Sequence, residues 1–421
     1  MVPLILFKFD GVFGLKANIW KLYFVRMSQW FLLIMPFFFL FFQNAGLSFS
    51  EIFIIQGVYN GAAFLMEIPS GYIGDRLTRK TSLVLGTFLA GSGFLTYYFT
   101  GQFEFFILAA ILMGVGTSFI SGSDSALLYD TLMDLEREGD YLKFEGKASA
   151  FGNFAESIAA IVGGFIAIYF SIEANLLVQG CLLLFSCLLV ISCKEPSQAQ
   201  KHERISFWKA LSFLFTEMTK NKRFGQIMLF SSFMGVNSLC MAWLVQPYME
   251  LHLGWSISEA IPLSEFFTAT WKEMTTNGMA WILLWSVLNS IVGVFAISSN
   301  KIYSKLGKLT VYLIALGLLV PYVTLNFHTP IILIVSFFIF YAARGLVTPL
   351  FRKWINESVE SNVRATALSV RAFLFRILFA FVSFALLGPL MDLYSIETTF
   401  LVMGGIFTLS AIPYLLYVKK V

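Results

Sequence analysis

Apolar runs long enough to cross a membrane alternate with short polar segments along most of this chain. A helix needs about 20 apolar residues to span about 30 Å of hydrocarbon. The alternating pattern of strands is absent, and backbone groups in lipid must be paired within their own segment, so runs of this length are expected to be helices. We predict an all-α polytopic membrane protein with twelve spans, at residues 20–43, 51–70, 81–99, 103–129, 146–170, 172–194, 225–249, 277–299, 309–326, 329–351, 365–390 and 395–418.

The composition and the placement of positive charge support this class and give an orientation. Hydrophobic residues make up 58% of the chain and charged residues 13%, which excludes an ordinary soluble globule. If both termini are cytoplasmic, 24 of the 29 Lys and Arg fall in cytoplasmic segments and only Lys272 lies outside. The positive-inside rule therefore predicts a plasma or inner membrane protein with both termini inside. Because the basic residues are spread over loops, no nucleic-acid partner is expected.

The sequence gives little support for a signal peptide, a metal site, a cofactor or an enzymatic nucleophile. The first residues, MVPLILFKFDGVFGLK, show neither a basic start nor a small-residue cleavage site, so we expect a surface-lying helix or a misassigned start rather than a signal peptide. The four cysteines fall within spans, and we place His202, His252 and His328 in loops. No metal site, cofactor or enzymatic nucleophile is expected, and no ATPase-type glycine loop occurs.

The two halves of the chain repeat one another. The tripeptide Ser-Ile-Glu at 171–173 recurs at 395–397, and at the same offset of 224 residues Gly164, Val178 and Gly180 reappear as Gly388, Val402 and Gly404. A weaker echo relates 76–79 to 305–308. We predict two pseudo-symmetric six-helix halves, 1–194 and 225–421, joined by a basic cytoplasmic central loop at 195–224.

One polar segment carries the most specific motif. GYIGDRLTRK, from Gly71 to Lys80, packs four charges into six residues between spans two and three. It resembles the loop between the second and third helices of the major facilitator superfamily, except that Thr78 replaces the second glycine of the pattern. This departure puts the tightness of the turn in doubt, because glycine reaches left-handed dihedrals without steric cost.

Further segments extend this resemblance over nearly the whole chain. EIPSGYIGDR, SGSDSALLYDTL, VQPYMELHLG and RATALSVRAFLFR are similar to a bacterial branch of the superfamily. The drug-antiporter branch usually has an Arg in the middle of span four and a Gly-Pro-rich span five, and both are missing here. The resemblance implies a gating loop in which Asp75 meets the N-terminus of span eleven and an arginine meets the carboxylate ending span four. The gating residues are then Gly71, Asp75, Arg76, Arg79, Lys80 and Asp130.

Charges within the spans are costly, at least about 2.5–3.5 kcal/mol each, and need a partner or a function. Arg26 and Asp124 both lie about 9 Å from the cytoplasmic end of their spans and are expected to pair, as a functional or a purely structural pair. Glu156 and Arg376 lie near the midplane, where desolvation and a nearby cation compete for the protonation of a carboxylate. Glu156 is therefore our first candidate for proton coupling, with a static Glu156–Arg376 bridge as the alternative. The other intramembrane charges considered are Glu67, Arg344 and Arg371.

Spans one, four, seven and ten are expected to line the cavity of this architecture. Span seven contributes Asn237, Trp243, Gln246 and Tyr248, and span ten contributes Tyr341. Aromatic and amide groups suit an amphipathic organic solute better than a bare ion.

We therefore predict a monomeric secondary active transporter that moves a small amphipathic organic solute by alternating access, coupled to protons, with export favoured. The first alternative is an uptake symporter for a nutrient or a metal chelate. The second is a polytopic membrane enzyme or receptor without transport, for which no nucleophile, base or metal pattern is found within the spans.

Overall fold

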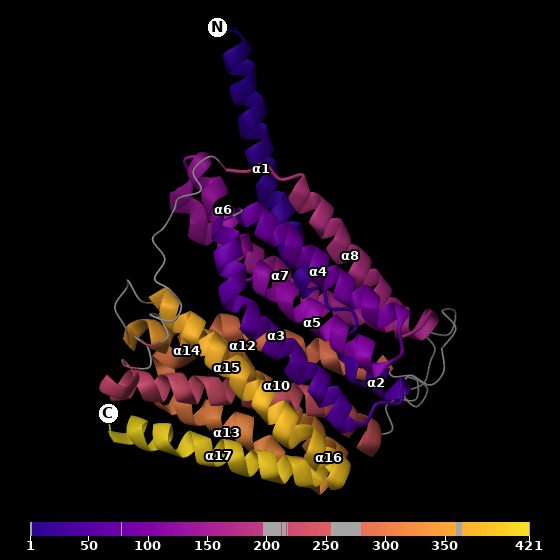
Figure 1. Cartoon of the computed structure of the whole chain (residues 1–421). Coiled ribbons are helices and arrows are strands. Elements are labelled where there is room, and N and C mark those ends of the chain that lie inside the picture. Colours follow the sequence, from indigo (N-terminus) through magenta and orange to yellow (C-terminus); the bar gives the residue numbers. More distant parts are fainter. Residues whose placement is uncertain are drawn as a thin grey trace. The chain divides into compact units, whose positions relative to one another are not determined.

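The computed structural model describes residues 2–76, 78–196, 212, 216, 218–253, 279–358 and 364–420, and these contain helices and no strand (Figure 1). They fall into two compact units. Unit 1 is Met1–Phe41 with Val58–Glu203, and unit 2 is Phe42–Gly57 with Arg204–Val421. The predicted central loop, 195–224, lies largely outside the described residues, together with His202 and Lys272.

The helices correspond to the predicted spans. The first half of the chain contains α1 (Val2–Trp30), η1 (Met35–Phe37), α2 (Phe38–Asn44), α3 (Phe49–Arg76), α4 (Arg79–Phe99), α5 (Phe103–Ile120), α6 (Ser123–Asp134), η2 (Glu138–Asp140), α7 (Tyr141–Tyr169) and α8 (Ala174–Ile191). The second half contains α10 (Lys222–Leu253), α12 (Met279–Leu306), α13 (Leu309–Thr324), η4 (Leu325–Phe327), α14 (Pro330–Ser358), α15 (Arg364–Val382), η6 (Ser383–Leu387), α16 (Gly388–Leu393) and α17 (Ile396–Lys420).

Eleven stretches of the described chain are long and apolar enough to cross a membrane, and the shorter apolar helix Phe154–Tyr169 supplies the twelfth predicted span. The N-terminal segment is continuous with the first span, since α1 begins at Val2. An all-α polytopic membrane protein is thus confirmed.

The first span is interrupted, whereas the sequence was expected to give one helix. Helix α1 ends at Trp30 and α2 begins at Phe38, with the short η1 between them. Pro36 lies at the start of η1 and cannot continue an α-helix, because it lacks an N–H group and its ring clashes with the carbonyl four residues earlier. Helix α7 passes close to this break. A Cβ atom on Gly163 would lie 2.2 Å from the carbonyl oxygen of Leu33, so only glycine fits there.

The fourth span is also interrupted. Helix α5 ends at Ile120 and α6 begins at Ser123, and Gly122 between them has φ +76°, in the left-handed region that favours glycine. The predicted span 103–129 therefore consists of two helices. In span eleven the helical path continues from α15 to α16 through a π-helical turn, η6.

Helix α4 lies between α5 and α8 in unit 1 (Figure 1), and glycines allow the close approach. Cβ atoms on Gly86 and Gly116 would lie under 3 Å from backbone atoms of the facing helix. Such small-residue contacts are how helices associate in lipid, where no hydrophobic driving force acts between them.

Residues paired by the internal repeat make similar local contacts. Gly180 of α8 faces α4 at Leu95, and its counterpart Gly404 of α17 faces α13 at Tyr322. The serines of the two Ser-Ile-Glu tripeptides also act alike. Each accepts a hydrogen bond from the backbone N–H three residues later, where α8 and α17 begin.

Residues 42–57 belong to unit 2, which the predicted halves do not anticipate. Asp392 accepts hydrogen bonds from the backbone N–H groups of Phe49 (3.0 Å) and Ser50 (2.8 Å), where a helix N-terminus favours an anion. Gly388 allows the contact, because a Cβ atom there would lie 2.6 Å from the Cα atom of Ser50. Helix α3 therefore starts in unit 2 and continues into unit 1.

Candidate functional site

Unit 1 contains a partly buried cluster of one cation and two carboxylates. The Nη2 atom of Arg26 lies 2.5 Å from Oδ2 of Asp124 and 3.3 Å from Oε1 of Glu145. The hydroxyl of Ser125 accepts a hydrogen bond from Arg26 (3.0 Å) and donates one to Glu145 (3.0 Å). The side chains are 16%, 11% and 24% exposed for Arg26, Asp124 and Glu145. We call these three residues the N-unit charge triad.

The interrupted fourth span positions this triad. Because the helix restarts after Gly122, Asp124 lies in the first turn of α6, where the positive end of the helix dipole stabilises an anion. Its Oδ1 atom accepts a hydrogen bond from the backbone N–H of Ser125 (2.7 Å). The predicted Arg26–Asp124 pair is present.

The sequence reasoning missed Glu145, which lies in the second turn of α7. The predicted fifth span begins at residue 146, so this carboxylate fell just outside it. Glu145 lies eleven residues before Glu156, about three helical turns, and this spacing could have placed both carboxylates on one face of the same helix.

The triad has a surplus of negative charge when all three groups are ionised. One arginine faces two carboxylates, and among the described residues the Oε2 atom of Glu145 and the Nε atom of Arg26 are buried without a hydrogen-bond partner. Tyr141, the first residue of α7, lies nearby. Burial raises the pKa of Tyr141, and the Glu145 carboxylate raises it further. Two carboxylates around one cation form an arrangement that can take up a proton.

The segment 71–80 is helical for most of its length rather than a loop. Helix α3 runs to Arg76 and α4 begins at Arg79. Thr78, at the position of the missing glycine, has φ −164° and ψ 162°, an extended conformation that any residue adopts. Its side chain caps α4 by accepting a hydrogen bond from the N–H of Thr81 (3.1 Å). The turn is therefore tight without glycine.

Thr78 and Lys80 also tie this turn to the end of α8. The hydroxyl of Thr78 donates to Oε2 of Glu195 (3.2 Å), and the Nζ atom of Lys80 donates to the carbonyl of Cys193 (2.7 Å). Burial raises the pKa of Glu195, while the Thr78 hydrogen bond and the Lys80 charge oppose this shift. The side chains of Gly71, Asp75 and Arg76 are outside the described part, and the Arg79–Asp130 pairing stays a prediction.

Glu156 lies on α7 in unit 1 and Arg376 on α15 in unit 2, so their bridge stays a prediction. Glu67 lies on α3, in the part that belongs to unit 1.

The predicted cavity residues of span seven are buried within unit 2. Asn237 is fully buried, and neither atom of its amide has a hydrogen-bond partner among the described residues. Trp243 and Gln246 are 5% and 8% exposed. The hydroxyl of Tyr248 donates to the carbonyl of Leu325, which gives this tyrosine a packing role. Gln226 and Ser232 of the same helix each have one buried polar atom without a partner among the described residues, whereas both polar atoms of the Asn237 side chain lack one.

Two arginines of unit 2 have no acidic partner in the described part of the chain. The guanidinium of Arg344 lies over the ring of Tyr341, 5.5 Å from its centroid. Arg371, on α15, has a buried Nε atom without a hydrogen-bond partner. These two cations differ from Arg26, which faces two carboxylates.

The histidines show one departure from the expected loops. Helix α10 extends to Leu253, so His252 lies in its last turn, whereas His328 lies in the turn before α14 as predicted. His252, His328 and Glu397 come together at one end of unit 2 although they are far apart in the sequence. No local spacing pattern could have shown this cluster.

Apolar helices interrupted at spans one and four, together with charges held inside the membrane-spanning part, are features found in polytopic membrane transporters. The sequence profile of the Major Facilitator Superfamily matches residues 19–381, so the chain belongs to this superfamily and is a transporter rather than an enzyme.

Relatives and solved structures agree with this assignment. An uncharacterized MFS-type transporter of Methanocaldococcus jannaschii is 22% identical over 270 residues, or 64% of this chain, and the match spans 63% of that relative's length. The nucleoside transporter NupG, in a mutant form, has a TM-score of 0.77 at 14% identity, covering 95% of this chain and 98% of that one. A D-xylose-proton symporter has a TM-score of 0.66 at 15% identity, covering 96% of each chain. The structural likenesses show the fold alone.

Proposed function

We propose that this protein is a proton-coupled secondary transporter that moves a small amphipathic organic solute by alternating access. The observation that carries the proposal is the N-unit charge triad, in which Arg26 faces both Asp124 and Glu145. With one cation and two carboxylates the triad carries one negative charge, and one bound proton neutralises it. Partly buried like charges make that proton favourable.

The surroundings of the triad support a role in the movement of α1 relative to α6 and α7. Asp124 is held at the start of α6, directly after the left-handed Gly122, and Arg26 lies on α1 ahead of the break before η1. Interrupted helices are where transporters bind substrates and coupling ions and where they bend. A proton on Asp124 or Glu145 weakens the attraction to Arg26 and so loosens α1 from α6 and α7.

Side chains of unit 2 support the proposed solute class. Asn237 offers a buried amide, and Arg344 and Arg371 offer positive charge without a carboxylate partner among the described residues. Buried aromatic side chains on the same helices provide apolar surface. We therefore propose a solute with an apolar body and a hydrogen-bond-accepting or anionic group.

Export across the plasma or inner membrane by a monomer with cytoplasmic termini remains our proposed direction and setting, with proton-coupled uptake of a nutrient or metal chelate as the alternative. Right-side-out and inverted vesicles, each with a proton gradient directed toward the cytoplasmic face of the protein, distinguish the two directions. An exporter should accumulate solute in the inverted vesicles, and accumulation in the right-side-out vesicles would instead show uptake.

The coupling proposal is tested in proteoliposomes. A thermal-shift screen over nucleosides, sugars, peptides and amphipathic acids first supplies a solute, because ligands that bind the folded state raise its apparent stability. Glu145→Gln and Asp124→Asn should then abolish gradient-driven transport of that solute while leaving solute exchange intact.

The matched control is Asp140→Asn, which removes a carboxylate from the exposed Arg137–Asp140 pair and should leave coupling unchanged. If both triad variants still concentrate solute on a pH gradient and Glu156→Gln alone loses this ability, the triad is not the coupling site and Glu156 takes its place.

A further inference from the structure

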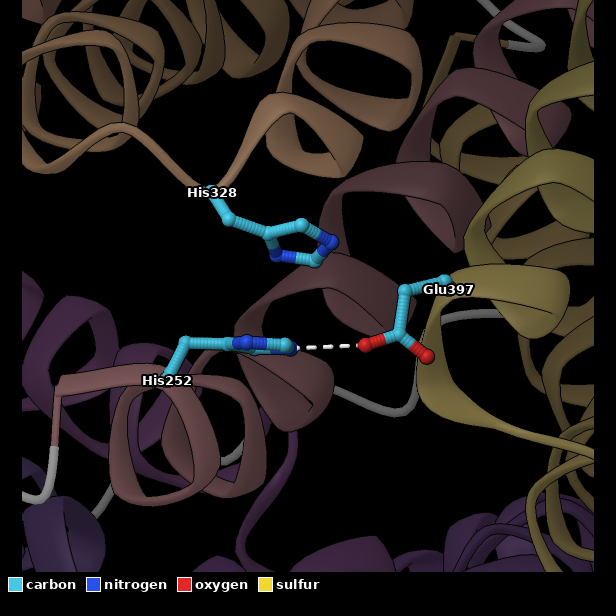
Figure 2. Close-up of side chains that lie close together, drawn as sticks. All are labelled: His252, His328 and Glu397. Atoms are coloured by element: carbon cyan, nitrogen blue, oxygen red, sulfur yellow. Dashed lines mark ion pairs between the residues drawn. The ribbon is translucent and has the colours of Figure 1, made fainter.

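One end of unit 2 brings together two histidines and a carboxylate from three separate elements. Figure 2 shows His252 from the last turn of α10, His328 from the turn before α14, and Glu397 from the first turn of α17, with their polar ends facing one another. Their ligand atoms all lie within 4.8 Å of one another. The Nε2 atom of His252 lies 2.7 Å from Oε1 of Glu397.

We propose that His252, His328 and Glu397 form a binding site for a borderline divalent transition-metal ion, with Zn²⁺ as the representative ligand. Two imidazoles with one carboxylate are a common protein ligand set for zinc, and they leave a fourth position open. Nitrogen donors favour Zn²⁺, Cu²⁺ and Ni²⁺ over Mg²⁺ and Ca²⁺, which prefer oxygen.

The spacing fits such an ion after a small adjustment. Ligand atoms about 2.0–2.2 Å from a tetrahedral zinc ion lie about 3.3–3.6 Å from one another. The exposed His328 ring stacks on the His252 ring, 4.3 Å between centroids, and turning out of this stack would point its nitrogen toward the other two ligands. The Nε2 atom of His252 is buried and faces Oε1 of Glu397 at 2.7 Å, so an ion bound by these two atoms would replace their ion pair.

The surrounding residues hold the site in place. Tyr248 lies one turn before His252, and the centroids of their two rings are 4.4 Å apart. The hydroxyl of Tyr248 donates a hydrogen bond to the carbonyl of Leu325, three residues before His328. The same tyrosine packs against Phe400 on α17, 5.3 Å between ring centroids. One buried side chain thus contacts or anchors all three elements that carry the ligands. Such supporting contacts are what orient metal ligands.

The site belongs to the second half of the chain alone. Glu173 is the counterpart of Glu397 in the internal repeat, and it lies beside the start of α8. The chain has three histidines, and the third, His202, is in the central loop. Glu173 and His202 are therefore matched controls of the same chemical type.

The test uses the full-length protein purified without a polyhistidine tag and stripped of metal with a chelator. Equilibrium dialysis against Zn²⁺ should show one bound ion per chain, and Co²⁺ should give the visible absorption bands of a tetrahedral nitrogen and oxygen site. His252→Ala and His328→Asn should each abolish stoichiometric binding, and Glu397→Gln should weaken it at least about tenfold. Asparagine is chosen at 328 because it tolerates the left-handed φ of 52° found there.

His202→Ala and Glu173→Gln should bind Zn²⁺ like the unmodified protein. Thermal unfolding of each variant in chelator checks its fold, and added Zn²⁺ should raise the unfolding temperature of the unmodified protein but not that of the two histidine variants. The proposal is overturned if stoichiometric binding is absent, or if binding survives in folded His252→Ala and His328→Asn. Transport is not measured, so the result is independent of the proposed function.

Discussion

Removing the cation of the N-unit charge triad should destabilise the protein strongly. In Arg26→Gln the two carboxylates of Asp124 and Glu145 lose the guanidinium that lies 2.5 Å and 3.3 Å from them. Two unit charges 3.3 Å apart attract by about 5 kcal/mol at an effective dielectric constant of about 20, and the desolvation of the ions offsets part of this. Deleting one partner of such a pair costs about 3–5 kcal/mol, because the remaining charges stay partly buried.

The assay is thermal unfolding of the purified protein in detergent at pH 8, followed by tryptophan fluorescence. A loss of this size corresponds to a decrease of about 6–20 °C in the unfolding temperature of a unit of 150–250 residues. The double variant Arg26→Gln with Glu145→Gln should recover part of the loss, because a single carboxylate then remains beside the vacated position.

The control is Arg137→Gln in the exposed Arg137–Asp140 pair, whose side chains are 44% and 42% exposed. Exposed pairs contribute about 0–1 kcal/mol, so the unfolding temperature should change little. Equal losses in Arg26→Gln and Arg137→Gln, or a double variant no more stable than Arg26→Gln, would refute the buried-triad reasoning.

Two further predictions use the same unfolding measurement. Thr78→Gly restores the usual residue of the superfamily turn, yet it should lower stability by about 1 kcal/mol, mainly because the hydrogen bond to Glu195 is lost and to a smaller extent because the side-chain cap is lost; a variant as stable as the unmodified protein would contradict this. Gly163→Ala should cost about 1–3 kcal/mol by forcing α7 away from the carbonyl of Leu33, whereas Gly405→Ala, with no atom within 4 Å of the added methyl, should be neutral or stabilising by up to about 1 kcal/mol. Equal effects at the two glycines would count against the close approach.

The helices and one ion pair could be predicted because their signals are local. Runs of apolar residues give the spans, and equal depth from the cytoplasmic ends was enough to bring Arg26 and Asp124 together. Glu145 was missed because it lies one residue before the predicted start of its span, although α7 begins four residues earlier. Span boundaries are the weakest part of hydropathy reasoning, and a carboxylate at a boundary is the residue most easily lost.

Breaks and distant clusters were harder to foresee. Pro36 and Gly122 lie inside apolar runs, and hydropathy alone gave each run as one uninterrupted span. The cluster of His252, His328 and Glu397 depends on three chain segments meeting at one end of unit 2, which hydropathy and residue spacing do not encode. A one-turn extension of α10 also moved His252 from a predicted loop into a helix.

The two halves of this chain make the corresponding helix–helix connection with different backbone conformations. In the first half Thr78 is extended and caps α4 with its side chain, whereas its repeat counterpart Gly307 is left-handed, with φ +51°, between α12 and α13. An ancestral repeat unit could therefore exchange glycine for threonine here without losing the connection, provided that the hydroxyl found the next helix. Pattern searches that demand glycine at this position will overlook transporters of this kind, and searches that accept a helix-capping residue will recover them.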